Sequence, residues 1–130
     1  MDSERYQRGR EILKELDPKV SDQVVANLSD IAPDFAKFMI EFPFGDLYSR
    51  PELDLKTREI VAVAALTVLG YATPQLKFHI GAALNAGCSR NEVVEILMQT
   101  AVYAGFPAAL NGLYAAKEVF RECDASGAKP

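Results

Sequence analysis

The strongest pattern along the chain is an apolar run at residues 60–69, IVAVAALTVL, in which Thr67 is the only polar side chain. A helix of this composition has no face suited to water, so we expect it to be buried within the fold or against a second subunit. A run of this length is too short to cross a bilayer, which needs about 20 residues. Asp54 before the run is a good helix N-cap and Gly70 after it a good helix terminator. The sequence therefore predicts a buried helix between them.

Two further helices are predicted directly after this run, at residues 73–87 and 89–105. In the first, Thr73 can cap the helix and Pro74 fits its first position, where the missing N–H costs nothing. The second opens with SRNE, a capping box in which a serine hydroxyl and a glutamate carboxylate each satisfy a backbone N–H. Because the connections are short, the three helices should be antiparallel neighbours.

Amphipathic patterns predict helices on both sides of this central unit. Before it, apolar residues at helical spacing indicate helices near residues 3–16, 21–31 and 33–42. Pro43 should kink or end the last of these, which leaves residues 44–53 as a loop. After the central unit, Pro107 restarts a helix whose small residues would let another helix approach closely. The apolar positions at helical spacing in the second and third helices are Val24, Val25, Leu28, Ile31, Phe35, Phe38, Met39 and Phe42.

No segment alternates apolar and polar residues with period two, as a half-buried strand would. We therefore predict an all-α fold of six or seven antiparallel helices. The length of 130 residues indicates one domain, over residues 1–123. Residues 124–130 have no apolar periodicity and are predicted to form a disordered tail.

Charge and composition narrow the classes of function. A net charge of −4 and a pI of about 5.0 argue against a nucleic-acid partner or an anionic membrane, since both need a basic surface. The N-terminal segment carries charges throughout and does not have the pattern of a secretory signal, so we expect a cytoplasmic protein. Two cysteines and one histidine are too few for a disulfide framework or a cysteine–histidine zinc site, so no metal is expected.

Three segments together resemble the carboxymuconolactone decarboxylase family of the alkylhydroperoxidase-D-like superfamily. They are LDLKTREIVAVAAL at 53–66, HIGAALNAG at 79–87 and EVVEILMQTAVYAGFPAALNG at 92–112. The resemblance implies an alkylhydroperoxidase-D-like helical fold and a homo-oligomer in which trimers pair into a hexamer. The apolar run at 60–69 and the phenylalanines at 35, 38, 42 and 44 also favour an oligomer, because one small domain does not readily cover so much apolar surface.

His79 is the first candidate for chemistry, because histidine is the side chain whose ordinary pKa lies close to neutrality. A core histidine that donates to a carbonyl is the alternative. Glu59 is the second candidate, although an acid in the first turns of a helix is also explained by the helix dipole. The family resemblance places a histidine at the position of His79 and, in the redox branch, its acidic partner at the position of Glu59. Antiparallel helices bring the two residues near each other without guaranteeing contact.

Arg58 and Lys77 are the nearby cations, and most such residues are simply solvated. If the substrate is anionic, Arg58 is the better candidate because a guanidinium holds a carboxylate through two hydrogen bonds. Tyr103 could donate its hydroxyl to a substrate oxygen, although a structural hydrogen bond is the more common role of a buried tyrosine.

The redox branch of the superfamily carries Cys-x-x-Cys-x-x-x-His, and this chain departs from that pattern. Ala72 and Gln75 occupy the cysteine positions before His79. Without a thiolate pair, a peroxide-reducing cycle through a disulfide has no chemistry to use. For Cys88 we favour the role of buried filler over that of a reactive thiol, and Cys123 should also be a free thiol.

The leading interpretation is therefore an enzyme of the decarboxylase branch, which acts on a small anionic substrate, a carboxylated unsaturated lactone such as 4-carboxymuconolactone. Such a substrate is its own electron sink, so no cofactor is expected. In this interpretation His79 and Glu59 are catalytic, and Arg58 and Tyr103 bind the substrate. The alternatives are an alkylhydroperoxidase or peroxiredoxin-like antioxidant protein and a non-enzymatic oligomeric domain of the same fold.

Overall fold

The computed structural model describes residues 2–127, and every regular element in this range is helical. Seven α-helices and one π-helix follow one another along the described chain, so the predicted all-α fold is confirmed. The contacts divide the chain into two compact units, one up to Asp54 and the other from Leu55 onward. That residues 1–123 form one domain stays a prediction. Among the described helices, none is long and apolar enough to cross a membrane.

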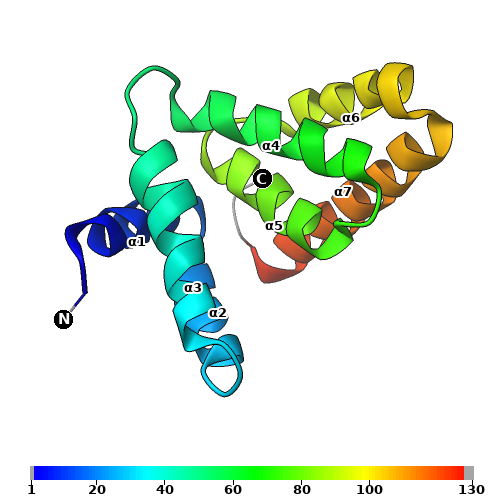
Figure 1. The fold of residues 1–130 in the computed structure, drawn as a ribbon. Helices are drawn as coiled ribbons and strands as arrows, with labels where there is room; N and C mark the ends of the chain where they lie inside the picture. Colours follow the sequence, from blue (N-terminus) through cyan, green and yellow to red (C-terminus); the bar gives the residue numbers. More distant parts are fainter. Residues whose placement is uncertain (1, 128–130) are drawn as a thin grey trace. The chain divides into compact units, whose positions relative to one another are not determined.

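The first unit contains α1, α2, α3 and the π-helix η1 (Figure 1), whose bounds are Glu4–Leu16, Val20–Leu28, Pro33–Met39 and Ile40–Leu47. Ser3 caps α1, since its hydroxyl accepts from the Tyr6 N–H at 3.1 Å. The same hydroxyl donates to the buried carboxylate of Glu41 on η1. The start of α1 is thereby fixed to the element against which it packs.

Two glycines allow α1 and η1 to pack with their backbones in contact. A Cβ atom added to Gly9 would lie 2.2 Å from the Ile40 carbonyl oxygen, and one added to Gly45 would lie 2.2 Å from the Arg5 carbonyl oxygen. At the edge of this contact, Arg5 donates to both carboxylate oxygens of Asp46, at 2.6 and 3.2 Å. The guanidinium of Arg5 holds the pKa of the Asp46 carboxyl below its usual value through this hydrogen bond.

The sequence predicted that Pro43 would kink or end the helix that begins at Pro33. In the structure α3 ends at Met39, and the chain continues through Pro43 as the π-helix η1 to Leu47. Proline has no N–H and its ring crowds the carbonyl four residues earlier, which is costly in α register. A π register shifts the hydrogen bonds by one residue, as in the 2.8 Å bond from the Tyr48 N–H to the Pro43 oxygen. The first four residues of the predicted loop, 44–47, are therefore helical.

Many of the apolar residues at helical spacing in this unit lie at its surface. On α2 only Ser21 is buried and Val25 is exposed, and Ile31, which follows α2, is exposed as well. On α3 and η1 the small or close-packed residues Ala36 and Ile40 are buried, and the bulky residues on the other side of the helix are not. The exposed residues of that side are Phe35, Phe38, Met39 and Phe42. The periodicity predicted helices here, but the close crossing at glycines buries the small face of α3 and η1 and not the bulky one.

The second unit consists of α4 (Leu55–Leu69), α5 (Thr73–Asn85), α6 (Arg90–Ala104) and α7 (Phe106–Ser126). Their turns use glycines with positive φ, at 82° for Gly70, 111° for Gly87 and 90° for Gly105, a conformation that other residues adopt at a cost. The predicted capping box at the start of α6 is confirmed. The predicted cap at Thr73 is wrong by one residue, because Ala72 is the N-cap of α5 and Thr73 already belongs to the helix.

The core of this unit lies between all four helices and includes Val63, Ile80 and Leu97 with small residues from α7. Gly112 illustrates why those residues are small. A Cβ atom added there would lie 2.9 Å from the Thr67 Cγ2 and 3.0 Å from the Leu97 Cδ2. The predicted close approach of another helix to α7 is confirmed, since α4 and α6 both contact it here.

The helix α4 is not buried on all sides by this unit, because Val61, Val68 and Leu69 are exposed. The alternative, that a second subunit covers it, stays a prediction. One other expectation for this unit needs correction. The helix α7 continues through residues 124–126, where the sequence predicted a tail, because Asp124 forms an ion pair with Arg90 of α6 at 2.7 Å. The remainder of the predicted tail, residues 128–130, lies outside the described part of the chain.

We expect Gly9→Ala to destabilise the first unit, because its new Cβ would collide with the Ile40 carbonyl group. Overpacking of this kind typically costs about 1–3 kcal/mol. Gly81→Ala is the matched control, since Gly81 also lies inside an α-helix but has open space around its Cβ position. There, alanine should stabilise by roughly 0.5–1 kcal/mol. Urea unfolding followed by circular dichroism measures both changes, and equal effects of the two variants would contradict the glycine crossing.

Candidate functional site

A buried acid and the only histidine of the chain form a direct pair between α4 and α5. The Nδ1 atom of His79 lies 2.6 Å from the Oε1 atom of Glu59. The Glu59 side chain is 0% exposed, whereas the His79 side chain is 16% exposed. The contact that the sequence left open is thus formed, with the ring reaching the surface and the carboxylate fully enclosed.

The α4–α5 hairpin sets the geometry of this pair. The short turn at Gly70 makes the two helices antiparallel, and the core residues Val63 and Ile80 hold their facing sides together. The Phe78 ring packs edge-on against the imidazole, with 4.7 Å between ring centroids. Because Nδ1 is engaged by Glu59, Nε2 is the ring nitrogen left for another partner.

The second oxygen of Glu59, Oε2, is buried and has no hydrogen-bond partner among the described residues. Such an atom is uncommon, since the great majority of buried polar atoms are hydrogen-bonded. An enclosed carboxylate with only one protein partner is costly to keep as a purely structural feature. This observation favours a functional role for Glu59 over a purely structural one.

The two candidate cations differ in their surroundings. Lys77 pairs with Glu118 of α7, and this hydrogen bond lowers the pKa of the Glu118 carboxyl. Lys77 thus has a structural partner that ties α5 to α7. Arg58 precedes Glu59 on α4 and is partly exposed. Because consecutive residues of a helix point in different directions, Arg58 and Glu59 do not share a face.

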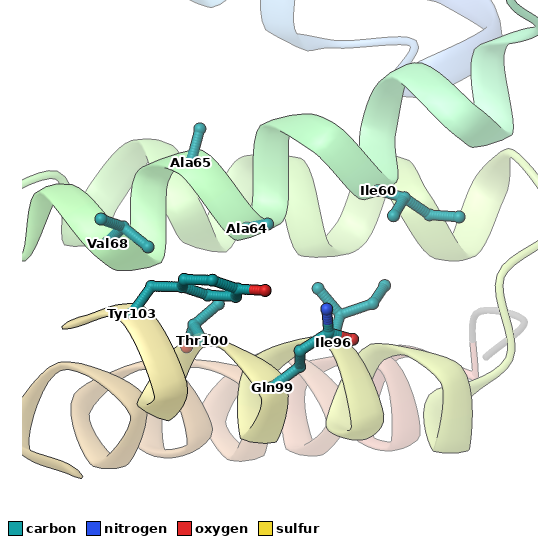
Figure 2. A pocket seen from close by; sticks show the side chains of 8 residues that line it. All are labelled: Ile60, Ala64, Ala65, Val68, Ile96, Gln99, Thr100 and Tyr103. Atoms are coloured by element: carbon teal, nitrogen blue, oxygen red, sulfur yellow. The ribbon is translucent and has the colours of Figure 1, made fainter. Parts of the chain in front are cut away.

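Tyr103 lies in a different place from the Glu59–His79 pair. It lines a groove between α4 and α6 with a volume of about 460 Å³, and Figure 2 shows its ring lying along that groove. The groove is lined by Ile60, Ala64, Ala65, Val68, Ile96, Gln99, Thr100 and Tyr103. Neither Glu59 nor His79 belongs to this lining. The groove therefore contains Tyr103 without the Glu59–His79 pair.

Sequence reasoning missed this groove, although a signal for it was present. Gln99 and Thr100 are polar residues within an otherwise apolar part of α6. Thr100 is buried and donates its hydroxyl to the Leu97 oxygen at 2.6 Å. The helical pattern predicts on which face of its helix each side chain lies. It does not predict the distance between two helices, and this distance decides whether a groove remains open between them.

The positions related to redox chemistry contain no thiol pair. Ala72 is buried and Gln75 is exposed at the two positions where the redox branch has cysteines. Cys88 is 3% exposed and belongs to the core cluster of the second unit. Burial raises the pKa of the Cys88 thiol, which disfavours the reactive thiolate. Among the described residues there is also no group of three or more histidine, cysteine or acidic side chains that could hold a metal ion.

Comparison with known proteins agrees with this arrangement. The model of the carboxymuconolactone decarboxylase family matches residues 33–118. The 4-carboxymuconolactone decarboxylase of Acinetobacter baylyi is 35% identical over 122 residues, which are 93% of this chain and 90% of that protein. An uncharacterized 15.0 kDa protein of Paracoccus denitrificans is 32% identical over 91% of this chain and 89% of its own length. The nitrosuccinic acid decarboxylase of Metarhizium robertsii is 26% identical over 66% of this chain and 59% of its own length.

The chain therefore belongs to the carboxymuconolactone decarboxylase family, which confirms the resemblance drawn from the three sequence segments. The matched residues include both members of the Glu59–His79 pair.

We predict that Cys88 reacts with Ellman's reagent at least about 10-fold more slowly than Cys123 in the folded protein, because its thiol is buried and its pKa is raised. The single variants Cys88→Ala and Cys123→Ala assign the two rates. In guanidinium chloride the two thiols should react at similar rates, which controls for local sequence effects. Rapid reaction of Cys88 in the folded protein would contradict its placement in the core.

Proposed function

We propose that this protein is a cofactor-independent decarboxylase whose substrate is a carboxylated unsaturated lactone such as 4-carboxymuconolactone. The observation that carries the proposal is the enclosed Glu59 carboxylate bonded to His79. Two of the relatives compared above are named as decarboxylases, which supports the reaction class. A cytoplasmic location suits this proposal, because free cysteines persist in a reducing cytosol.

In the proposed reaction the bond between the ring carbon and the departing carboxylate breaks, and carbon dioxide leaves. The electron pair of that bond moves through the ring double bond to the lactone carbonyl oxygen, which gives a dienolate. A proton added to the ring carbon beside the carbonyl then restores the lactone. The substrate thus loses carbon dioxide and gains one proton, and its own carbonyl accepts the electrons throughout.

His79 is the proposed source of that proton, from Nε2, while Nδ1 remains bonded to Glu59. The carboxylate would act as a positioning residue, because its hydrogen bond to Nδ1 fixes the orientation of the ring. The closed position of Glu59 keeps this interaction away from water. After the transfer, the partly exposed ring can regain a proton from solvent.

Arg58 is the proposed ligand of the substrate's negative charge. A cation on the departing carboxylate would stabilise the substrate more than the transition state, because that charge moves away as the bond breaks. Arg58 would therefore serve best at a carboxylate that the substrate retains. Tyr103 remains a predicted donor to the lactone oxygen, although its groove does not contain the Glu59–His79 pair.

The thiol-dependent alternative has less support. A disulfide cycle needs two cysteines that can meet and a thiolate that can attack. Ala72 and Gln75 do not supply them, and Cys88 is enclosed in the core with a raised pKa. Peroxidase activity that disappears in a folded Cys88→Ala, Cys123→Ala variant would revive this alternative.

We expect His79→Gln to lower kcat by about 10²–10⁴-fold, the usual contribution of a general acid, with little change in KM. Glutamine can still donate a hydrogen bond to Glu59, so His79→Gln should fold. His79→Ala is less suitable, because it would remove the hydrogen bond that His79 makes to the buried acid. Glu59→Gln should lower kcat by a smaller factor. Gln75→Ala, one turn away on α5 and exposed, is the control that should keep the parent kcat.

The assay follows the ultraviolet absorbance of a panel of carboxylated lactones. Circular dichroism confirms that each variant is folded. If a lactone in the panel is turned over and His79→Gln has the parent rate, the proposed role of His79 is wrong. If no lactone reacts with the parent protein, the substrate class is wrong.

We expect Arg58→Gln to raise KM by about 10–100-fold, because a hydrogen bond to a charged group contributes roughly 1.5–3 kcal/mol. The KM of Arg58→Lys should lie between those of the parent and Arg58→Gln. Lysine keeps the positive charge but cannot form the two parallel hydrogen bonds of a planar guanidinium. A change confined to kcat would instead place Arg58 in the proton-transfer step.

A further inference from the structure

The Glu59–His79 pair uses only one of the two ring nitrogens of the histidine. Nδ1 lies 2.6 Å from the Glu59 Oε1 atom, and the carboxylate is fully enclosed while the ring reaches the surface. A bound molecule that exchanges a proton with the imidazole therefore does so at Nε2. This one atom must both give a proton and take one back, because Nδ1 stays in the hydrogen bond to Glu59.

The other ionisable side chains of α4 and α5 are less suited to this task. Besides the pair, these two helices carry Lys56, Arg58 and Lys77. Both lysines form ion pairs with glutamates of other helices, and a guanidinium does not give up its proton in proteins. The thiol of Cys88, in the turn after α5, is buried, and this burial raises its pKa. His79 is therefore the proton-exchanging group of the α4–α5 hairpin.

A site with one such nitrogen has a chemical consequence. In the proposed decarboxylation, Nε2 gives its proton to the dienolate at the ring carbon beside the carbonyl. By microscopic reversibility, the same nitrogen without its proton removes a hydrogen from that carbon in the reverse direction. The hydrogen lies between a carbonyl and a ring double bond, so the electrons that it leaves behind are delocalised onto the carbonyl oxygen. This step needs no departing carboxylate.

We propose that the protein also catalyses proton exchange and double-bond isomerisation of a β,γ-unsaturated lactone that has no carboxylate to lose. The C–H bond beside the carbonyl breaks, its proton moves to Nε2 of His79, and its electron pair moves to the carbonyl oxygen, which gives the dienolate. Return of a proton to the same carbon restores the starting lactone. Delivery of the proton to the far end of the dienolate gives the α,β-unsaturated isomer. The lactone gains and loses one proton, and no electron donor or acceptor is needed.

The exchange activity rests on the proposed function, because it uses the same site and passes through the same dienolate. The two reactions share only the proton transfer, so exchange is an activity of its own. Its substrate class is a small unsaturated lactone that keeps one carboxylate, the class that decarboxylation of 4-carboxymuconolactone releases. The hydrogen bond to Glu59 and the edge-on packing of Phe78 hold the imidazole in one orientation. A fixed ring suits a nitrogen that serves both ends of one dienolate.

The test uses the lactone that forms when 4-carboxymuconolactone loses carbon dioxide, dissolved in heavy water with the parent protein. Proton NMR follows the signal of the hydrogens beside the carbonyl. Deuterium should replace these hydrogens at least about 100-fold faster than in the same buffer without protein, which is the lower end of general acid–base catalysis. The α,β-unsaturated isomer should appear in the same samples faster than in buffer.

Variants assign the exchange to its group. His79→Gln should lower the protein-dependent exchange rate by about 10²–10⁴-fold, and Glu59→Gln should lower it by a smaller factor. Gln75→Ala, at an exposed position of the same helix, should keep the parent rate. The double variant Cys88→Ala, Cys123→Ala should also keep it, because no thiol takes part. Circular dichroism checks the fold of every variant.

The outcomes separate the exchange activity from the proposed decarboxylation. If 4-carboxymuconolactone is decarboxylated but its product exchanges no faster than in buffer, the exchange activity is absent and the proposed function stands. If the product exchanges while no carboxylated lactone loses carbon dioxide, the exchange activity stands and the proposed function is wrong. Exchange in neither experiment would contradict both. Exchange by folded His79→Gln at the parent rate would assign the reaction to another group and overturn the role of Nε2.

Discussion

The buried carboxylate of Glu59 is the constraint on which the second unit depends. Removing a carboxyl group from water is costly, and one hydrogen bond to His79 offsets only part of that cost. The hairpin must therefore hold α4 and α5 in fixed register, which the glycine turn and the core around Val63 and Ile80 achieve. The unit thus uses packing energy from its apolar core to maintain a polar pair that packing alone would not favour.

The charges of the unit are arranged around this constraint. Ion pairs connect the helices at the end that carries the charged residues: Lys56 with Glu92, Lys77 with Glu118 and Arg90 with Asp124. These pairs are partly exposed, so each contributes little to stability, but together they fix which helices are neighbours.

Local signals in the sequence predicted much of this architecture, because caps and glycine terminators act within a few residues. The capping box of α6 and the ends at Gly70 and Gly105 needed no tertiary information. Contacts between distant residues were harder to predict. The π register at Pro43 depends on packing against α1, and the exposure of Val68 depends on what faces α4. For the site, the sequence predicted Glu59 and His79 as candidates but not the contact between them. A displacement of a few ångströms between two packed helices decides whether their side chains meet.

The same reasoning explains how one scaffold can serve two chemistries. Reduction of a peroxide needs electrons from outside the substrate, which the redox branch takes from its two cysteines. Decarboxylation of an unsaturated lactone needs none, because the electrons of the broken bond stay within the product. Replacing the cysteine positions by Ala72 and Gln75 removes the electron source and leaves the Glu59–His79 pair in place. What remains is a carboxylate–imidazole pair, and a proton donor is the one component that the proposed decarboxylation would not obtain from its own substrate.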